Sequence, residues 1–527
     1  MTLHGKSLIN GKSVAGTDGE TAGVDPTSNE TLEPPYTLIS SEQLREATTA
    51  AADAYPSFSA LSPSARAAFL NTIADNIEAI GDELIARAGA ETGLPAARLT
   101  GERARTCNQL RLFADVVIRG DFYGVRIDPA LPDRKPLPRA DIRHYQRPLG
   151  PVAVFGASNF PLAFSTAGGD TASALAAGSP VVFKAHNAHP GTSELVGHAI
   201  ASAVAQHNLH PGVFSLVFGR GADIGQALVA DPVIKAVGFT GSRSAGIALM
   251  RTAAARPVPI PVYAEMSSIN PVFVFPGALE GDIDSLAQQY ITSVTGSSGQ
   301  LCTSPGLLFA PTGNAGDRLV AAVADAVQKC TGQTMLTPHI AAAWQRGTND
   351  LESVETVEVV ARGEDGPTLN APAPTIFGAG LTEFVDNAAL HAEIFGAASL
   401  VIRYDAASDL VTAINALEGQ LTATLHLTDD DHVDVAPLLP LLEETVGRII
   451  VNGWPTGVEV GHAVVHGGPF PATSDSRTTS VGSLAIERFL RPVAYQDTPQ
   501  PLLPPPLQDS NPWGLSRRID GVVVSAR

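Results

Sequence analysis

The sequence predicts an α/β protein with a doubly wound parallel sheet, and two observations support this prediction. From residue 152 onward, short apolar segments alternate with alanine-rich segments of helical spacing, which is the pattern of consecutive strand and helix units. The chain of 527 residues is several times longer than an average domain, so it can bury more than one core. We therefore expect two or three domains.

The region before this sheet is predicted to be helical. Within residues 41–119 apolar side chains recur at helical spacing, and the stretch 64–86 shows that spacing most clearly. Residues 125–146 instead contain short β-like pieces around the proline-rich stretch 129–138. This change of pattern predicts a protruding hairpin.

The expected strands of the first sheet are separated by helical patterns. They are the apolar segments 152–155, 181–184, 213–218, 237–240 and 261–265. A second α/β segment is expected over 270–467, with a helix at 283–295 and apolar runs at 271–275, 306–309, 400–404 and 448–451. The tail from residue 498 carries six prolines by Pro512, so we expect it to be extended.

Composition and charge argue against several classes of function. Fifty-three acidic residues against 34 basic ones give a net charge of −19, which repels phosphate backbones and anionic lipid headgroups. We expect neither a nucleic-acid nor a membrane partner. The three cysteines lack CxxC spacing, so neither a disulfide framework nor a metal site is expected. No apolar stretch is long enough for a signal peptide or a membrane span, which favours a cytoplasmic protein.

Residues at the ends of the predicted strands are candidates for function, because open α/β sheets bind ligands at the carboxyl ends of their strands. Asn159 follows the first strand, and Glu265 ends the last one. Cys302 lies in a glycine-containing loop after the helix at 283–295. Taken singly, Cys302 fits a small core residue, Glu265 a solvated acid and Asn159 an Asx turn.

Seven short motifs stand in order along the chain: Leu8-Ile9-Asn10-Gly11-Lys12, Ser158-Asn159-Phe160-Pro161, Phe183-Lys184, Phe239-Thr240-Gly241-Ser242, Glu265, Gly299-Gln300-Leu301-Cys302 and Glu393-Ile394-Phe395-Gly396. With these motifs in this order, the chain resembles the aldehyde dehydrogenase superfamily. Residues 466–473 and 487–493 are similar to the subgroup that contains α-ketoglutaric semialdehyde dehydrogenases and NADP-linked fatty aldehyde dehydrogenases.

This resemblance implies a Rossmann-type cofactor-binding domain, an α/β catalytic domain and a small β oligomerisation arm. The cofactor-binding domain would comprise residues 1–124 and 147–268, the catalytic domain 269–485, and the arm 125–146 and 486–527. Alternating apolar residues over 487–495 predict an edge strand in the arm, and exposed edge strands invite pairing. We expect a homodimer or a dimer of dimers.

The resemblance also implies NAD(P)-dependent oxidation of an aldehyde to a carboxylate through a cysteine thioester. Cys302 would be the nucleophile, Asn159 would donate to the oxyanion, and Glu265 would activate the water that hydrolyses the thioester. α-Ketoglutarate semialdehyde is the expected substrate and 2-oxoglutarate the product. A medium- or long-chain fatty aldehyde dehydrogenase, a cysteine esterase and a non-catalytic structural member of the superfamily are the alternatives.

The expected cofactor site does not rely on a GxGxxG fingerprint, which is absent after the first strand. The resemblance places the pyrophosphate at the helix that opens near Gly241 and Ser242, with Gly246 in its first turn. It places the adenosine ribose near Lys184. Glu393 and Phe395 resemble the pair that holds the nicotinamide ribose.

One departure from the family bears on the choice between NAD and NADP. NAD-preferring relatives carry an acid three residues after the lysine, whereas here Lys184 is followed by Ala185, His186 and Asn187. A neutral amide does not repel a 2′-phosphate, and Arg220 is a candidate second cation. NADP is therefore slightly favoured over NAD.

Substrate residues are the least constrained by the sequence. Arg105 and Gln109 lie on a helix that resembles one lining the aldehyde funnel, and Arg105 or Arg111 could hold a substrate carboxylate. A surface arginine bonded to water explains either one equally well. His466 resembles a histidine near the catalytic cysteine, but it also fits a turn before Gly467.

Overall fold

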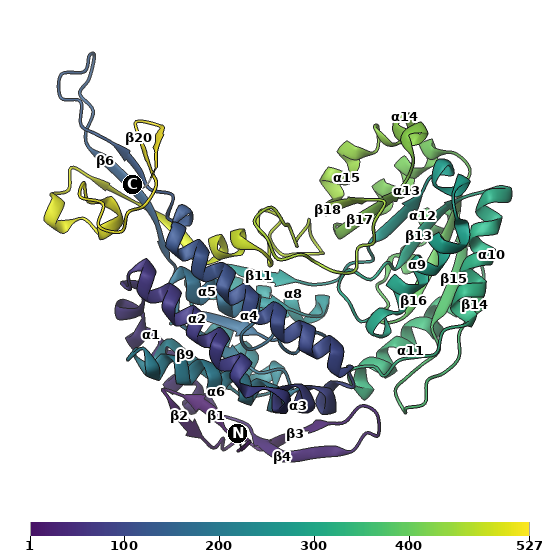
Figure 1. The fold of residues 1–527 in the computed structure, drawn as a ribbon, viewed down its shortest axis with the longest axis horizontal. Helices are drawn as coiled ribbons and strands as arrows, with labels where there is room; N and C mark the ends of the chain where they lie inside the picture. The colour runs from purple at the N-terminus through teal and green to yellow at the C-terminus, as the bar shows by residue number, and fades with distance from the viewer. Residues whose placement is uncertain (1, 526–527) are drawn as a thin grey trace.

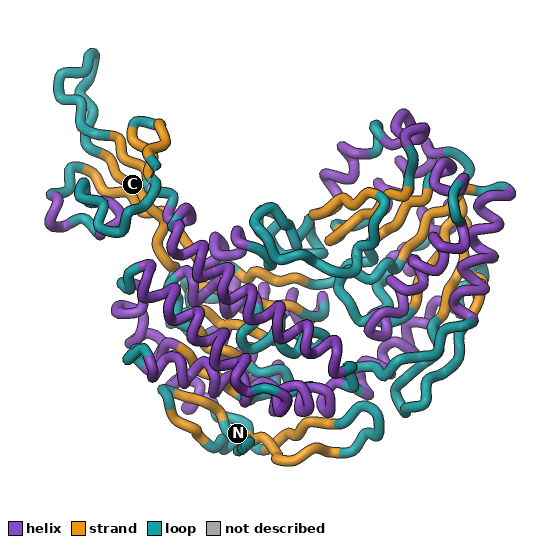
Figure 2. The backbone as a smooth tube through the Cα atoms, viewed as in Figure 1, coloured by secondary structure: helices purple, strands orange, loops and turns teal. Residues whose placement is uncertain are grey.

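Two seven-stranded sheets and a five-stranded β arm dominate the computed structural model, which describes residues 2–525 (Figure 1). The sheets are mixed but mainly parallel, and helices cover their faces (Figure 2). This arrangement confirms the predicted α/β class. Among the helices of residues 2–525, none is long and apolar enough to cross a membrane.

The first sheet has the strand order β11-β10-β7-β8-β9-β1-β2. Its five parallel strands are those predicted: β7 (Val152–Phe155), β8 (Val181–Lys184), β9 (Phe214–Val217), β10 (Ala236–Thr240) and β11 (Val262–Glu265). The N-terminal strands β1 (Ser7–Ile9) and β2 (Lys12–Val14) extend the sheet in antiparallel fashion. A separate pair, β3 (Glu20–Val24) and β4 (Thr31–Thr37), lies along one side of this unit.

Helices pack on both sides of this sheet, and the helical prediction for residues 41–119 is confirmed. The helices are α1 (Ser41–Ser59), α2 (Pro63–Ile80), α3 (Asp82–Thr92), α4 (Ala96–Arg119), α5 (Gly169–Ala177), α6 (Pro190–Gln206), α7 (Gln226–Ala230) and α8 (Arg243–Ala254). The amphipathic stretch 64–86 is not one helix. It breaks at Gly81, whose φ of 70° lies in the left-handed region that glycine tolerates best.

The second sheet has the order β14-β15-β16-β13-β12-β17-β18 and is parallel except for the edge pair β14 and β15. Its strands are β12 (Pro271–Val274), β13 (Leu307–Pro311), β14 (Glu358–Arg362), β15 (Thr375–Gly380), β16 (Ala398–Tyr404), β17 (Gln420–His426) and β18 (Val446–Val451). The predicted apolar runs correspond to β12, β13, β16 and β18. β17 escaped prediction because threonine, glutamine and histidine interrupt its apolar residues, although all seven of its residues are buried.

The helices around this second sheet include α9 (Ile283–Thr295), which has the predicted bounds. The others are α10 (Asn314–Gln328), α11 (Pro338–Glu352), α12 (Leu381–Asp386), α13 (Leu410–Ala416), α14 (His432–Val435) and α15 (Leu439–Thr445).

The β arm projects from the first unit and carries the described end of the chain (Figure 1). Its order is β19 (Leu490–Gln496), β6 (Ile142–Pro148), β5 (Arg126–Asp128), β20 (Arg517–Ile519) and β21 (Val522–Val524). The edge strand predicted from residue 487 begins at Leu490, because a 3₁₀ helix occupies Ser483–Phe489.

The proline-rich tail was expected to be extended, but the structure shows that it is not. It makes short turns and ends in the hairpin of β20 and β21. Leu507 and Leu515 are buried in it, and Arg143 of β6 donates to the carbonyl of Leu507 at 2.7 Å. Apolar burial and this buried guanidinium hold the tail against the arm.

The chain returns to the first sheet after completing the second. The amide of Met266 donates to the carbonyl of Ala472 at 2.8 Å, and the amide of Ser474 donates to the carbonyl of Ala264 at 2.9 Å. Thr473 forms an antiparallel bridge with Glu265. Residues 472–474 thus cover the open edge of β11 where Glu265 lies.

Candidate active site

Cys302 follows a tight turn whose backbone only a few sequences can adopt. Ser297, Ser298 and Gly299 all have left-handed φ angles, of 55°, 56° and 66°. A Cβ placed on Gly299 would lie 2.3 Å from the carbonyl carbon of Gly396, so this position requires glycine. The turn brings the cysteine loop directly against the segment that carries Glu393 and Phe395.

Asn270 fixes the backbone on either side of the thiol. Its side-chain amide donates to the carbonyls of Cys302 and Ser304, each at 2.9 Å. Asn270 is fully buried and has a φ of 47° at the start of β12. The sequence offered no sign of this role, because the contact joins residues 32 positions apart.

His466 and Glu265 lie against the thiol. Nε2 of His466 lies 3.3 Å from the Sγ of Cys302 and 2.9 Å from an oxygen of Glu265. Ser480 donates to the other carboxylate oxygen of Glu265 at 2.7 Å. The relative exposures of His466 and Glu265 are 1% and 3%. His466 is therefore part of the site rather than only a turn residue, and Ser480 is a further member that the sequence did not indicate.

Burial and neighbouring charge set the protonation of this cluster. Burial raises the pKa of the Cys302 thiol well above its usual value, and the carboxylate of Glu265 raises it further. Burial alone would raise the pKa of Glu265, but His466 and hydrogen bonds from its neighbours outweigh that effect and lower it. A neutral thiol thus lies beside an ionised carboxylate. Deprotonating the sulfur requires an acceptor at hand, and Glu265 and His466 are both in place.

Asn159 also lies beside the cysteine loop. Its side-chain amide donates to the carbonyl of Gln300 at 3.0 Å, two residues before Cys302. Its own carbonyl accepts from Arg98 of α4 at 2.7 Å, while Glu102, one turn further along α4, accepts from the amides of Leu162 and Ala163 at 2.8 and 3.0 Å. Two side chains of α4 therefore fix the turn 159–163, one at its first residue and the other at its last two.

Lys184 and Asn187 face one another at the carboxyl end of β8. Nζ of Lys184 lies 3.3 Å from the side-chain oxygen of Asn187, and burial lowers the pKa of Lys184 to about 8. His186 is half-buried and stacks on the buried His189, and its Nδ1 accepts from the amide of Ala188 at 3.1 Å. Arg220, after β9, is half exposed and lies 3.8 Å from the carboxylate of Asp18.

The opening of α8 has the geometry expected of a helix that follows a strand end. Ser242 is its N-cap and accepts from the amide of Ala245. A Cβ on Gly241 would lie 2.7 Å from the ring of Phe239, and one on Gly246 would lie 2.6 Å from the sulfur of Met266. Both glycines are therefore explained by close packing, and they bring the first turn of α8 close to β11.

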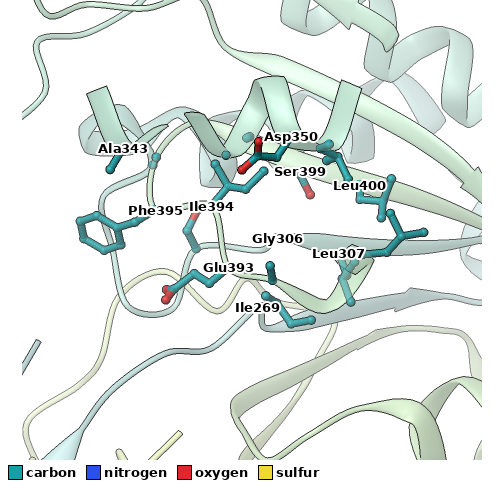
Figure 3. A pocket seen from close by; sticks show the side chains of 18 of the residues that line it. Ile269, Gly306, Leu307, Ala343, Asp350, Glu393, Ile394, Phe395, Ser399 and Leu400 are labelled. Atoms are coloured by element: carbon teal, nitrogen blue, oxygen red, sulfur yellow. The ribbon is translucent and has the colours of Figure 1, made fainter. Parts of the chain in front are cut away.

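Glu393 and Phe395 lie on one loop at the edge of a cavity of about 360 Å³ (Figure 3). Ile269, Gly306 and Leu307 form another part of its wall. Glu393 is half-buried, and partial removal of its carboxyl group from water raises its pKa to about 8. The cavity reaches the cysteine loop through Gly299 and Leu301.

A second cavity, of about 270 Å³, is lined by Arg105 together with Asn108, Leu112, Val458, Glu459 and Val460. The Nε and one Nη of Arg105 are buried without a hydrogen-bond partner among residues 2–525. The guanidinium lies 5.6 Å from the ring of Phe164, which itself contacts the His466 ring. Arg105 therefore offers unsatisfied donors close to the reactive cluster.

The two other substrate candidates on α4 lie elsewhere. Gln109 is buried against Gly169 and does not line this cavity. Arg111 is bound by the carboxylates of Glu78 and Asp75 at 2.7 and 2.8 Å. Arg111 is thus paired with acidic side chains of α2 and does not line the cavity of Arg105.

Comparison with known proteins identifies the family. Residues 14–469 match the aldehyde dehydrogenase family. The chain is 52% identical to α-ketoglutaric semialdehyde dehydrogenase 2 of Azospirillum brasilense and 45% identical to α-ketoglutaric semialdehyde dehydrogenase of Acinetobacter baylyi, in each case over 99% of both chains. The solved structure of betaine aldehyde dehydrogenase from Staphylococcus aureus, in complex with NAD+, has a TM-score of 0.80 at 19% identity, covering 95% of this chain and 99% of that one. This chain therefore belongs to the aldehyde dehydrogenase family and is an oxidoreductase that acts on aldehydes.

Proposed function

We propose that this enzyme oxidises α-ketoglutarate semialdehyde to 2-oxoglutarate with NADP or NAD, through a thioester on Cys302. The observation that carries the choice of substrate is the buried guanidinium of Arg105, whose Nε and one Nη lack partners among the described residues. A substrate with a carboxylate at the far end from its aldehyde would satisfy these donors. The names of the two relatives at 52% and 45% identity support the same substrate.

The side chains around Cys302 supply the groups that this reaction needs. The sulfur attacks the aldehyde carbon, and its proton passes to Glu265 or His466, whose atoms lie within 4.8 Å of it. The amide of Asn159 and the backbone N–H of Cys302 stabilise the oxygen as it gains charge. Glu265 then takes a proton from the water that attacks the thioester, and the carboxylate product leaves.

The residues present fit a nicotinamide dinucleotide, which accepts a hydride when bound. The N-terminus of α8 presents free backbone amides for the pyrophosphate, beside the close-packed Gly241 and Gly246. Lys184 is a buried cation whose Nζ bonds, among residues 2–525, to the side-chain oxygen of Asn187. Glu393 has the carboxylate that can bind ribose hydroxyls, and Phe395 stands beside it at the cavity.

The assignment of Arg105 is tested by Arg105→Ala. Because a charge-assisted hydrogen bond to the substrate is lost, we expect KM for α-ketoglutarate semialdehyde to rise about 10- to 100-fold, with a smaller change in kcat. Oxidation of an uncharged aldehyde such as octanal should change little. The rates are read from the absorbance of the reduced nicotinamide. Arg111→Ala is the matched control, since Arg111 is on the same helix but bound by Glu78 and Asp75.

An equal loss for charged and uncharged aldehydes would contradict this role for Arg105. If the parent enzyme oxidises octanal more efficiently than the semialdehyde, the fatty aldehyde alternative replaces the proposed substrate.

The second part of the proposal is a slight preference for NADP, and Asn187→Glu tests it. A carboxylate at position 187 would repel the 2′-phosphate by about one to three kcal/mol after solvent relaxation, or roughly ten- to hundredfold in relative affinity. NAD should bind equally well or better, because its 2′-hydroxyl can donate to the new acid. The measured quantity is the ratio of kcat/KM for NADP to that for NAD.

Arg220→Ala accompanies this variant and should weaken NADP alone if the arginine reaches the phosphate. An unchanged NADP to NAD ratio in Asn187→Glu would mean that position 187 does not face the ribose, and the cofactor preference would then be undecided.

We also propose that the enzyme is a homodimer or a dimer of dimers assembled through the β arm. β19 is an edge strand of the arm. Elsewhere in the arm several apolar side chains are exposed: Leu137, Ile142, Val522 and Val523. We expect sedimentation at micromolar concentration to give a multiple of the 54.6 kDa chain mass. Sedimentation at the mass of a single chain would contradict this assembly.

A further inference from the structure

Three metal-binding types of side chain meet at the reactive cluster. The thiol of Cys302, a carboxylate oxygen of Glu265 and Nε2 of His466 all lie within 4.8 Å of one another. The residues come from positions 265, 302 and 466, so spacing along the sequence could not reveal the set and led to the expectation of no metal site.

The distances suit tetrahedral coordination. Zn²⁺ binds thiolate at about 2.3 Å and imidazole or carboxylate at about 2.0 to 2.2 Å, which separates neighbouring ligand atoms by roughly 3.2 to 3.6 Å. The Nε2 of His466 already lies 3.3 Å from the sulfur and 2.9 Å from the carboxylate oxygen. The sulfur and the carboxylate oxygen lie within 4.8 Å of one another, so the three ligand atoms already surround one position.

Charge and orientation favour the same ligand. A thiolate and a carboxylate together carry two negative charges, which a divalent cation neutralises in a buried site. Binding releases the thiol proton, and Nε2 of His466 must be free of its proton as well. Ser480 holds one oxygen of Glu265 at 2.7 Å and leaves the other facing His466 and Cys302.

We infer that Zn²⁺ and similar thiophilic divalent cations inhibit this enzyme by binding Cys302, His466 and Glu265 together, in competition with the aldehyde. The fourth coordination position is left to water. Nδ1 of His466 is buried and lacks a hydrogen-bond acceptor among residues 2–525. Since such an acceptor typically strengthens a histidine ligand 10- to 100-fold, we expect micromolar rather than nanomolar affinity. The inference does not depend on which aldehyde is the substrate.

The test uses Co²⁺ as a spectroscopic substitute for Zn²⁺ in the full-length protein. We expect one Co²⁺ per chain, with a thiolate-to-cobalt charge-transfer band in the near ultraviolet that Zn²⁺ displaces. Cys302→Ser should remove the band, and His466→Asn should weaken cobalt binding at least about tenfold. Cys330→Ser is the matched control and should leave the band unchanged, since the Cys330 thiol donates to the carbonyl of Ala326 and is not part of the cluster of Cys302, Glu265 and His466.

A parallel measurement follows inhibition of aldehyde oxidation by Zn²⁺. The apparent inhibition constant should rise linearly with aldehyde concentration, and a chelator should restore the rate.

Several results would overturn the inference. These are the absence of a charge-transfer band in the parent protein, a band that survives Cys302→Ser, a band lost in Cys330→Ser, and zinc inhibition that aldehyde does not relieve. If Cys302→Ser proves misfolded by circular dichroism, Cys302 is instead alkylated with iodoacetamide in the folded Cys330→Ser protein. Retention of the band after that alkylation counts equally against the site.

Discussion

Cys302→Ala is expected to reduce aldehyde oxidation by at least about four orders of magnitude, because the sulfur forms the bond through which every later step passes. Esterase activity toward an activated ester should disappear with it. The substitution removes one atom beside His466, so the remaining side chains should keep their positions. Turnover is measured from the absorbance of the reduced nicotinamide, with cofactor affinity determined separately by fluorescence.

Cys330→Ser provides the matched control for this prediction. Its thiol is partly exposed and bonds to the backbone of α10, remote in sequence from the reactive loop. Turnover of Cys302→Ala within tenfold of the parent enzyme would mean that a different group is the nucleophile.

Glu265→Gln is expected to separate the two halves of the reaction. Acylation precedes the water step, so rapid mixing should still show a burst close to one reduced nicotinamide per site. Steady turnover should fall about 10²- to 10⁴-fold, because glutamine cannot act as the general base for the attacking water. The thiol retains a proton acceptor, because His466 lies 3.3 Å from the sulfur. The glutamine side chain can also accept from Ser480 and His466, which preserves the local geometry.

Ser480→Ala is a useful companion variant, since it removes one hydrogen bond from Glu265 but leaves the carboxylate. It should cost far less turnover than Glu265→Gln. If Glu265→Gln shows no burst while Cys302 still reacts with iodoacetamide, Glu265 acts before the thioester forms, and the division of roles proposed above is wrong.

The fold could be predicted from the sequence for one physical reason, whereas the roles of Asn159, Glu265 and Cys302 were predicted from the resemblance to the aldehyde dehydrogenase superfamily. Buried parallel strands have continuous apolar composition, and a strand end fixes which residue faces a ligand. Glu265 ends β11, Asn159 lies in the turn after β7, and Cys302 lies in the loop after α9. β17 was missed because its polar residues bond inside the protein, as Gln420 does to the amide of Ile269 at 2.7 Å.

The residues that orient these groups could not be predicted, because their partners are distant in sequence. The role of each such residue follows from its hydrogen-bond partner. Asn270 bonds to the backbone of Cys302, Ser480 to the carboxylate of Glu265, and Arg98 to the backbone of Asn159. Gln109 lies four residues after Arg105 on the same helix, but its side chain is buried against Gly169 and does not line the cavity of Arg105 and Asn108.

The return of residues 472–474 to the edge of β11 has a consequence for how the protein matures during synthesis. β11 is complete once residue 265 has been made, yet its edge pairs with a segment some 200 residues further along the chain. Contacts of such long sequence separation form late. His466 and Ser480 arrive with the same segment. A nascent chain that stalls before residue 466 would therefore carry a thiol and a carboxylate without the neighbours that orient them. It would also expose the edge of β11, because residues 472–474, which pair with that edge, have not yet been made.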